Sequence, residues 1–314
     1  MRPLIVLSLY IVLVAVLGAL GAPVLWHVVQ GFRDVPWMPE AVTGAGFQRV
    51  ANRAFMLVAL VLLPFMLAAM KLEGRRNWGL AVSRGAGLKA LALGLIFGAS
   101  TMAVLVGMQW AIGMRSVDPE VTAGALLAAA VSGLIGGLVI SVIEECFFRG
   151  GIYAACERDF GFTVAVTVSA LVYAAVHFVR AEGDIGPIDG WAGFRMLGLA
   201  WEGATHMPKL GPFLALIGVG VFLGVLRRHL GHAVAGMGVH AGWVMMIRLG
   251  RSGLDLDQES PLAFLAPDAK AGGYDGVTGY LAAVYMLLLI IALAMWIRTR
   301  RRSQPLADPW NNAR

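Results

Sequence analysis

The sequence predicts an all-α membrane protein, a polytopic bundle of about eight transmembrane helices, and two observations support this fold class. The chain has 314 residues, 59% of them hydrophobic and 14% charged, and its mean hydropathy is +0.75. Average soluble domains carry about 25% charged residues. The second observation is a series of apolar runs of membrane-spanning length. We expect a single integral membrane domain over residues 1–314, with a polar tail at 303–314.

Eight apolar runs follow one another along the chain, and each predicts one spanning helix. They lie near residues 3–24, 54–72, 86–112, 122–147, 161–179, 211–229, 231–249 and 279–297. Many of the 40 glycines lie inside these runs. Because small residues let membrane helices approach closely, the pattern predicts a tightly packed bundle rather than a pore.

Lysine and arginine flank the apolar runs unequally, which predicts the orientation of the chain. The basic connections are 73–85, 148–160, the turn at 227–229 and the C-terminal tail. The opposite loops, near 31–53, 113–121, 180–210 and 250–278, are longer or mixed in sign. We expect both termini in the cytoplasm and a bacterial inner membrane as the location. Because the net charge of +6 comes from residues beside the spans, nucleic acid is not an expected partner.

Three ionisable side chains interrupt the end of the fourth apolar run, in the sequence Ile-Glu-Glu-Cys-Phe-Phe-Arg-Gly-Gly at 143–151. A charge at bilayer depth costs at least about 2.5–3.5 kcal/mol, so such residues tend to mark functional sites. Glu145 and Arg149 are four residues apart on one helix face, which predicts that they pair. Glu144 is rotated by about 100° and is not neutralised by that pair. It is therefore a candidate general base.

Two histidines in later apolar runs are the candidate partners of Glu144. Counted from the turn at 159–161, Glu144 and His177 each lie about 22–26 Å along neighbouring antiparallel helices, so we expect them at the same depth. By the same residue counting, His240 lies somewhat closer to the cytoplasm than Glu144 and His177. Its helix would have to tilt or bend to bring His240 to their depth. We expect the three side chains to share one wet pocket, where Glu144 and His177 activate water and His240 stabilises an oxyanion.

A metal ion is a second way to use the same side chains. Glu144, His177 and His240 with water form a possible ligand set, but the sequence has neither a His-Glu-x-x-His helix nor a third firm ligand. No cofactor is therefore assigned, and a metal requirement stays open. Cys146, inside the charged motif, is expected to be a small apolar filler rather than a nucleophile.

Together, Glu144-Glu145-x-x-x-Arg149, Tyr173-x-x-x-His177 and His240 resemble the CAAX prenyl protease and bacteriocin-processing family. This family of intramembrane glutamate proteases is also called CPBP, Abi or type II CAAX endopeptidases, and the resemblance covers roughly residues 120–250. It implies an eight-helix bundle whose active site lies within the membrane and opens toward the cytoplasm. It also implies that Glu144 with His177 activates the attacking water and that Glu145 and Arg149 hold the geometry. His240 would form the oxyanion site with an asparagine four residues later.

The chain departs from that family pattern at two positions. Tyr173 stands where phenylalanine is commoner, which is a mild change. Val244 occupies the asparagine position, and its side chain cannot donate a hydrogen bond. Because one oxyanion donor is worth about 2.7–4 kcal/mol, either Trp243 or Arg149 substitutes or the activity is weak.

The function expected from these features is an endopeptidase that hydrolyses a peptide bond of a membrane-associated, lipidated or exported peptide. The expected partners are the lipid bilayer and a peptide or protein substrate. The alternative is a non-catalytic immunity or scaffold protein of the same fold. A proton-coupled transporter fits less well, because the chain shows no repeated halves and no pair of broken helices.

Overall fold

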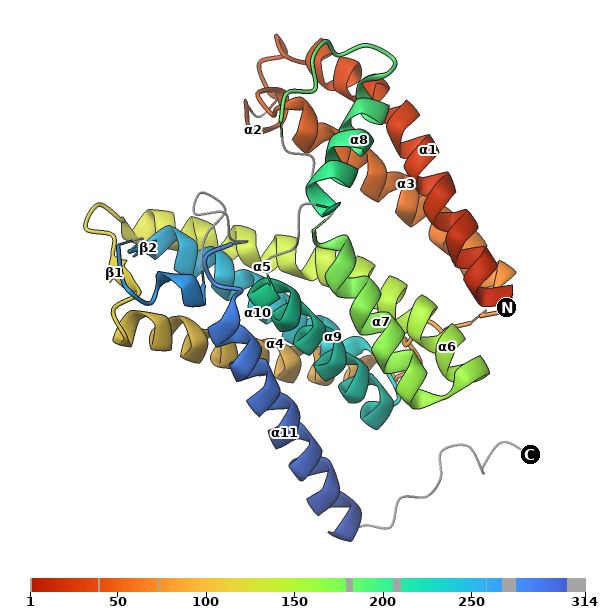
Figure 1. The fold of residues 1–314 in the computed structure, drawn as a ribbon, viewed down its shortest axis with the longest axis vertical. Coiled ribbons are helices and arrows are strands. Elements are labelled where there is room, and N and C mark those ends of the chain that lie inside the picture. Colours follow the sequence, from red (N-terminus) through yellow and green to blue (C-terminus); the bar gives the residue numbers. More distant parts are fainter. Residues whose placement is uncertain are drawn as a thin grey trace.

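The computed structural model describes residues 2–38, 40–72, 74–178, 183–205, 210–257, 259–266 and 275–303, and these are mainly helical (Figure 1). The longer helices are α1 (Arg2–Gly31), α3 (Phe47–Ala69), α4 (Arg84–Ala111), α5 (Ala123–Glu145), α9 (Leu210–Leu230), α10 (Val234–Gly253) and α11 (Tyr280–Ser303). The shorter ones are α2 (Glu40–Thr43), α6 (Tyr153–Phe160), α7 (Phe162–Val176) and α8 (Ala192–Thr205), with a π-helix at Cys146–Ile152 and a 3₁₀ turn at Ala263–Leu265. The predicted helical membrane bundle is confirmed.

Six helical segments of the described chain are long and apolar enough to cross a membrane, as expected of a multi-pass protein. They are Ile5–Gly31, Phe47–Ala69, Arg84–Ala111, Ala123–Phe160, Leu210–Leu230 and Tyr280–Arg300. The predicted count of eight is therefore not confirmed, although all eight apolar runs form helices. Helix α7 has only 15 residues, and α10, which carries Arg248 and Arg251, is not among the six.

The burial of α10 explains why this helix is less apolar than the others. Every residue from 235 to 243 is buried, and α4 and α5 pack along the helix. A helix enclosed by protein does not face lipid tails, so it needs shape complementarity more than an apolar surface. Polar side chains are accepted there when they find partners inside the bundle.

Glycines bring α4 and α10 into direct backbone contact. A methyl group added at Gly98 of α4 would collide with the carbonyl of Val239. One added at Gly238 of α10 would collide with the carbonyl of Leu91. This reciprocal contact is the close approach that small residues permit in membranes. It fixes the position of His240, which directly follows Val239, along the bundle axis.

Helices α1, α3 and α8 form a group that stands apart from the bundle of α4, α5, α7, α9 and α10 over most of its length (Figure 1). Helix α8 lies in the stretch 180–210, where the sequence predicted only a loop, and its Gly193 packs against the backbone of Ala19 in α1. The group meets the bundle near the π-helix, where the rings of Tyr10 and Phe147 stack with centroids 5.4 Å apart. Residues from both groups of helices therefore pack against the segment that carries the charged motif.

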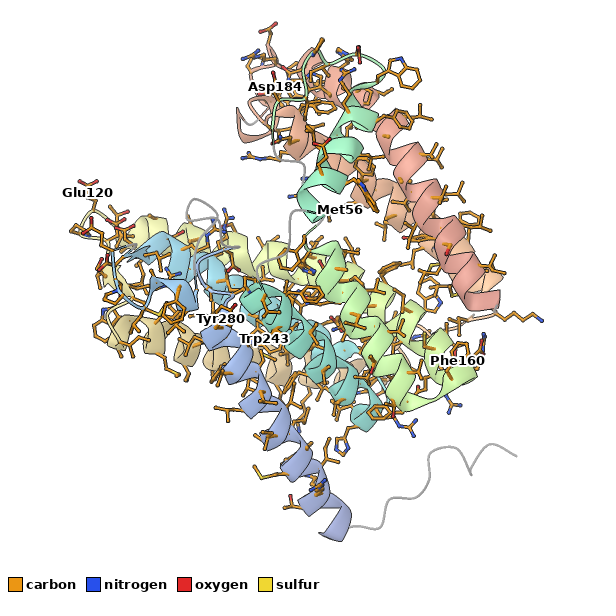
Figure 2. The ribbon with its side chains drawn as sticks, viewed as in Figure 1. Met56, Glu120, Phe160, Asp184, Trp243 and Tyr280 are labelled. Carbon is orange, nitrogen blue, oxygen red and sulfur yellow. The ribbon has the colours of Figure 1, made fainter. Side chains whose placement is uncertain are left out.

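A short antiparallel pair of strands is the one β element of the described residues and departs from a purely helical fold. Strand β1 (Arg115–Val117) pairs with β2 (Leu254–Leu256), which joins the ends of α4 and α10. Figure 2 shows Glu120 beside this pair and Phe160 at the α6–α7 turn, at opposite ends of the helical bundle. Which end faces the cytoplasm stays a prediction from the charge pattern.

Candidate active site

The charged motif lies where the fourth spanning helix changes its winding. Helix α5 ends at Glu145, and the seven residues Cys146–Ile152 form a π-helix before α6 begins. The amide of Tyr153 donates to the carbonyl of Phe148, five residues back. The hydroxyl of Ser169, on α7, donates to the same carbonyl at 3.2 Å. Such single-turn π segments occur frequently at functional sites, and here the segment is fixed to its neighbour by a buried hydrogen bond.

Glu145 and Arg149 form a fully buried ion pair at the centre of the site. Nη1 of Arg149 lies 3.0 Å from Oε1 of Glu145, and both residues have 0% exposure. The guanidinium carbon also lies 4.9 Å from the ring centre of Tyr173. The pairing expected from the four-residue spacing is therefore present, although the intervening residues are π-helical. A buried charge pair of this kind holds the surrounding helices in one arrangement, because separating the charges leaves one unpaired.

Glu144 lies beside both histidines. Its Oε2 atom is 4.0 Å from Nε2 of His177 and 3.8 Å from Nε2 of His240. The side chains of Glu144 and His177 keep about a fifth of their surface exposed (20% and 19%), whereas that of His240 has 7%. The Glu144 Oε2 atom is buried and accepts no hydrogen bond from the described protein groups. A buried acceptor of this kind is satisfied by water or by a substrate.

The position of His240 corrects the sequence estimate. Residue counting along straight α-helices placed His240 closer to the cytoplasm than Glu144, yet the two side chains are in contact. The close contact of the α10 backbone with α4 sets the level of His240, and residue counting along a straight helix does not include it.

Backbone and carboxylate acceptors fix the tautomers of the two imidazoles. Nδ1 of His177 lies 2.7 Å from the carbonyl oxygen of Tyr173, which can only accept. His177 therefore carries its hydrogen on Nδ1, and Nε2, facing Glu144, is an acceptor in the neutral ring. Nδ1 of His240 lies 3.3 Å from Oε1 of Glu145, which likewise accepts. In the neutral ring of His240, Nε2 is an acceptor as well.

Of the two substitutes suggested for the missing asparagine, Trp243 directs its donor to another group. The indole N–H of Trp243 donates to Oγ1 of Thr101 at 3.0 Å, and Trp243 lies inside the bundle (Figure 2). Arg149 is fully buried and directs Nη1 to Glu145, whereas its Nε has no hydrogen-bond partner among the described groups. Val244 itself has no donor.

The structure brings all five predicted site residues, Glu144, Glu145, Arg149, His177 and His240, into one cluster. Sequence reasoning gave no role to Ser169, which holds the π-helix, or to the ring of Tyr173, which packs against both histidines. A signal was present, because Ser169, Tyr173 and His177 are spaced by four and share one face of α7. Among the described residues, no group of three or more metal-binding side chains has the arrangement of a metal site.

Comparison with known protein families gives a match to the central part of the chain. Residues 126–246 match the sequence model of a family described as type II CAAX prenyl endopeptidase Rce1-like. The matched segment contains all five clustered residues and Tyr173. No curated protein and no solved structure matches the chain.

Proposed function

We propose that this chain, whose residues 126–246 match the Rce1-like type II CAAX prenyl endopeptidase family, is a membrane endopeptidase of the glutamate type. In this proposal Glu144, His177 and His240 act on the substrate, and Glu145 and Arg149 position them. The observation that carries it is the approach of Glu144 Oε2 to the Nε2 atoms of both histidines, at 4.0 and 3.8 Å.

The attacking water is held between Glu144 and His177. Both facing atoms, Oε2 of Glu144 and Nε2 of His177, are acceptors, so one water molecule donates one hydrogen to each. Glu144 removes a proton as the water oxygen forms a bond to the carbonyl carbon of the scissile peptide. His177 orients the water, and its own orientation is set by the Nδ1 hydrogen bond to the Tyr173 carbonyl.

The negative charge that develops on the former carbonyl oxygen is stabilised on the side of His240. Glu145 accepts from Nδ1 of His240, so Nε2 donates to this oxyanion when the ring is doubly protonated. The tetrahedral intermediate then collapses with cleavage of the carbon–nitrogen bond. The proton held by Glu144 passes to the departing amine, which returns the carboxylate to its starting state.

The substrate class that fits this assignment is a lipidated or exported peptide whose scissile bond enters the bilayer. A cysteine that carries a prenyl chain near the C-terminus supplies both a membrane anchor and a defined distance to the cleaved bond. We propose a bacterial inner membrane as the location, because the connections expected on the cytoplasmic side are basic.

The experiment compares purified protein with Glu144→Gln protein in proteoliposomes. The probes are a quenched fluorescent peptide with a farnesylated cysteine three residues before its C-terminus and the same peptide without the lipid. A second readout is mass spectrometry of new peptide termini after incubation with host membranes. Glu144→Gln keeps the shape of the side chain but removes the base, so we expect cleavage to fall by at least about 100-fold.

Glu120→Gln is the matched control, because Glu120 is exposed at the opposite end from the α6–α7 turn (Figure 2). This control should cleave like the wild type, and both variants should keep the wild-type melting temperature. The alternative function is a non-catalytic scaffold, and valine instead of asparagine at position 244 favours it. Cleavage products that are absent with wild-type protein, or equally abundant with Glu144→Gln, would support that rival.

A further inference from the structure

The end of the molecule that carries the α6–α7 turn has a basic surface. Helices α3 and α4 both have the length and composition of membrane spans, so the chain that joins them emerges at a membrane surface. Arg158 of α6 donates to the carbonyl of Met70 at 2.6 Å, and Arg227 of α9 donates to that of Arg76 at 3.2 Å. These contacts bring the ends of α6 and α9 to the same surface. Its basic side chains include Lys71, Arg75, Arg76, Arg158, Arg227 and Arg228.

Carboxylates at this end neutralise only part of the positive charge. The sequence places Glu73, Glu157 and Asp159 here. Asp159 pairs with its neighbour Arg158 at 2.6 Å, and Glu157 pairs with Arg228 at 2.9 Å. The side chains at positions 75 and 76, both arginines, are exposed. An exposed excess of positive charge at the depth of the lipid headgroups attracts anionic lipids.

The segment that carries these two arginines also touches the backbone of the π-helix. We call residues 74–80 the basic loop. A methyl group added at Gly150 would lie 2.9 Å from the carbonyl oxygen of Trp78 and 3.1 Å from its Cα atom. The absence of a side chain at Gly150 therefore lets the basic loop lie directly on the π-helix. Because Gly150 follows Arg149, a shift of the basic loop acts on the backbone that carries the buried ion pair.

The basic loop holds the start of α10 as well. The amide of Ala233, the residue before α10, donates to the carbonyl of Gly79 at 2.7 Å. A methyl group added at Gly79 would lie 2.8 Å from Cβ of Ala233, and its φ of +73° favours glycine. Helix α10 carries His240. One loop thus contacts both segments that build the site, the π-helix with Arg149 and the helix with His240.

We propose that the basic loop binds the phosphate groups of anionic phospholipids through Arg75 and Arg76, and that this contact holds the π-helix and α10 in the catalytic arrangement. The inference goes beyond the proposed function, and only its activity readout rests on that function. Phosphate fits because arginine presents paired N–H donors to its oxygens. In a neutral bilayer the attraction to the surface is lost, and the basic loop is held by its protein contacts alone.

The first test compares cleavage of the farnesylated quenched peptide in vesicles of phosphatidylcholine alone and with equimolar phosphatidylglycerol. Wild-type kcat should be at least about fivefold higher in the anionic vesicles, and the double variant Arg75→Gln/Arg76→Gln should lower this ratio to below about twofold. The matched control is Arg49→Gln/Arg53→Gln, because both arginines are exposed at the other end of α3. It removes the same charge and should keep the wild-type ratio. A double variant of the basic loop that keeps the ratio would overturn the inference, as would equal wild-type kcat in both vesicles.

A second comparison separates the lipid from a soluble ion. Inorganic phosphate added to neutral vesicles should leave wild-type kcat unchanged, because the proposed ligand is a headgroup concentrated at the membrane surface. A rise equal to that produced by phosphatidylglycerol would overturn the assignment to lipid. High salt should reduce the wild-type ratio, since salt screens exposed charges. A ratio that stays the same in high salt would contradict binding through the two arginines.

Gly150→Ala tests the path from the basic loop to the site. The added methyl group displaces the carbonyl of Trp78, so kcat in anionic vesicles should fall and the ratio between the two vesicles should approach one. Gly151→Ala is the control in the same π-helix, because its nearest atoms are the side-chain ends of Met66 and Leu67, at 3.1 and 3.4 Å. It should keep the wild-type ratio. If Gly150→Ala keeps the ratio too, the lipid does not act through the π-helix.

Hydrogen exchange measures the same coupling without any substrate, and it remains decisive if Gly150→Ala fails to fold. Anionic lipid should slow amide exchange in the basic loop and in the π-helix of the wild type, but not in Arg75→Gln/Arg76→Gln. Equal exchange in the two kinds of vesicle would overturn the inference and leave the endopeptidase standing. Lipid-dependent protection without any cleavage that requires Glu144 would overturn the proposed function and support the lipid contact.

Discussion

The Nε2 atom of His177 lies 4.0 Å from Oε2 of Glu144, although the two residues belong to helices separated by the π-helix and α6. This distance is too long for a direct hydrogen bond. It suits one water molecule that makes hydrogen bonds of about 2.8 Å to both atoms. The two side chains therefore form a pair of acceptors set to orient a nucleophile, and the predictions below concern the groups that maintain this spacing.

The first prediction concerns the buried ion pair. Arg149→Met should lower the free energy of unfolding in mixed micelles by about 3–5 kcal/mol, because Glu145 is left charged and buried. Glu145→Gln combined with Arg149→Met should be less destabilised than Arg149→Met alone, because both charges are gone. Asp189→Asn is the control, since Asp189 and Arg195 form an exposed pair. It should cost no more than about 1 kcal/mol. Equal losses in all three proteins would contradict the account.

The second prediction concerns the hydrogen bond that fixes the π-helix. Ser169→Ala removes the hydrogen bond from α7 to the Phe148 carbonyl, which keeps the amide of Tyr153, so we expect a cost of about 0.5–1.5 kcal/mol. We expect kcat to fall as well, because the π-helix connects Glu144 to Arg149. Ser141→Ala is matched in burial, but its hydroxyl donates within its own helix to Leu138. If Ser141→Ala lowers kcat as much as Ser169→Ala, the π-helix has no special role.

The third prediction tests the glycine contact that positions α10. Gly98→Ala places a methyl group against the carbonyl of Val239, so α4 and α10 must separate. Both the melting temperature and kcat should fall, because His240 follows Val239 directly. Gly107→Ala, on the same helix, meets no atom within 4 Å and should stabilise the helix by up to about 1 kcal/mol. If the Gly98→Ala protein is destabilised but its kcat is unchanged, the contact stabilises helix packing without positioning His240, and the prediction is wrong.

The fourth prediction concerns pH and the turn between α9 and α10. Burial, and then the nearby Arg227, lower the pKa of His232 below its ordinary value of 6.5. The His232 imidazole therefore binds a proton more weakly in the folded protein than in the unfolded chain. The free energy of unfolding consequently decreases as the pH falls below about 6.5. Melting temperatures of wild type and His232→Gln should diverge between about pH 7.5 and 5.5, with the wild type losing more. His27→Gln, at an exposed position, should follow the wild type. Parallel curves for wild type and His232→Gln would contradict this.

The sequence was sufficient for relations that depend on spacing within one helix or across one turn. The four-residue interval predicted the contact of Glu145 with Arg149, and counting from the α6–α7 turn placed Glu144 and His177 at one level. It failed for His240, because glycine contacts with α4 set the position of α10.

Other features depend on tertiary surroundings that a single sequence does not reveal. Helix α8 was predicted as loop, since its packing partner is α1, far away in the chain. Trp243 was considered as an oxyanion donor, and only the structure shows that its N–H is directed to Thr101. The count of eight spans came from apolar runs alone and is not confirmed, and the enclosure of α10 by other helices is visible only in the structure.

The most direct test of the water-activation claim is a single turnover in water enriched in ¹⁸O, with protein in excess over the farnesylated peptide. If Glu144 acts as a general base, the new carboxyl group of the product acquires one ¹⁸O atom and Glu144 acquires none. If Glu144 attacks the carbonyl itself and water then opens the mixed anhydride at the Glu144 carbon, the product leaves with ordinary oxygen and the label appears in the Glu144 carboxylate, which would contradict the account.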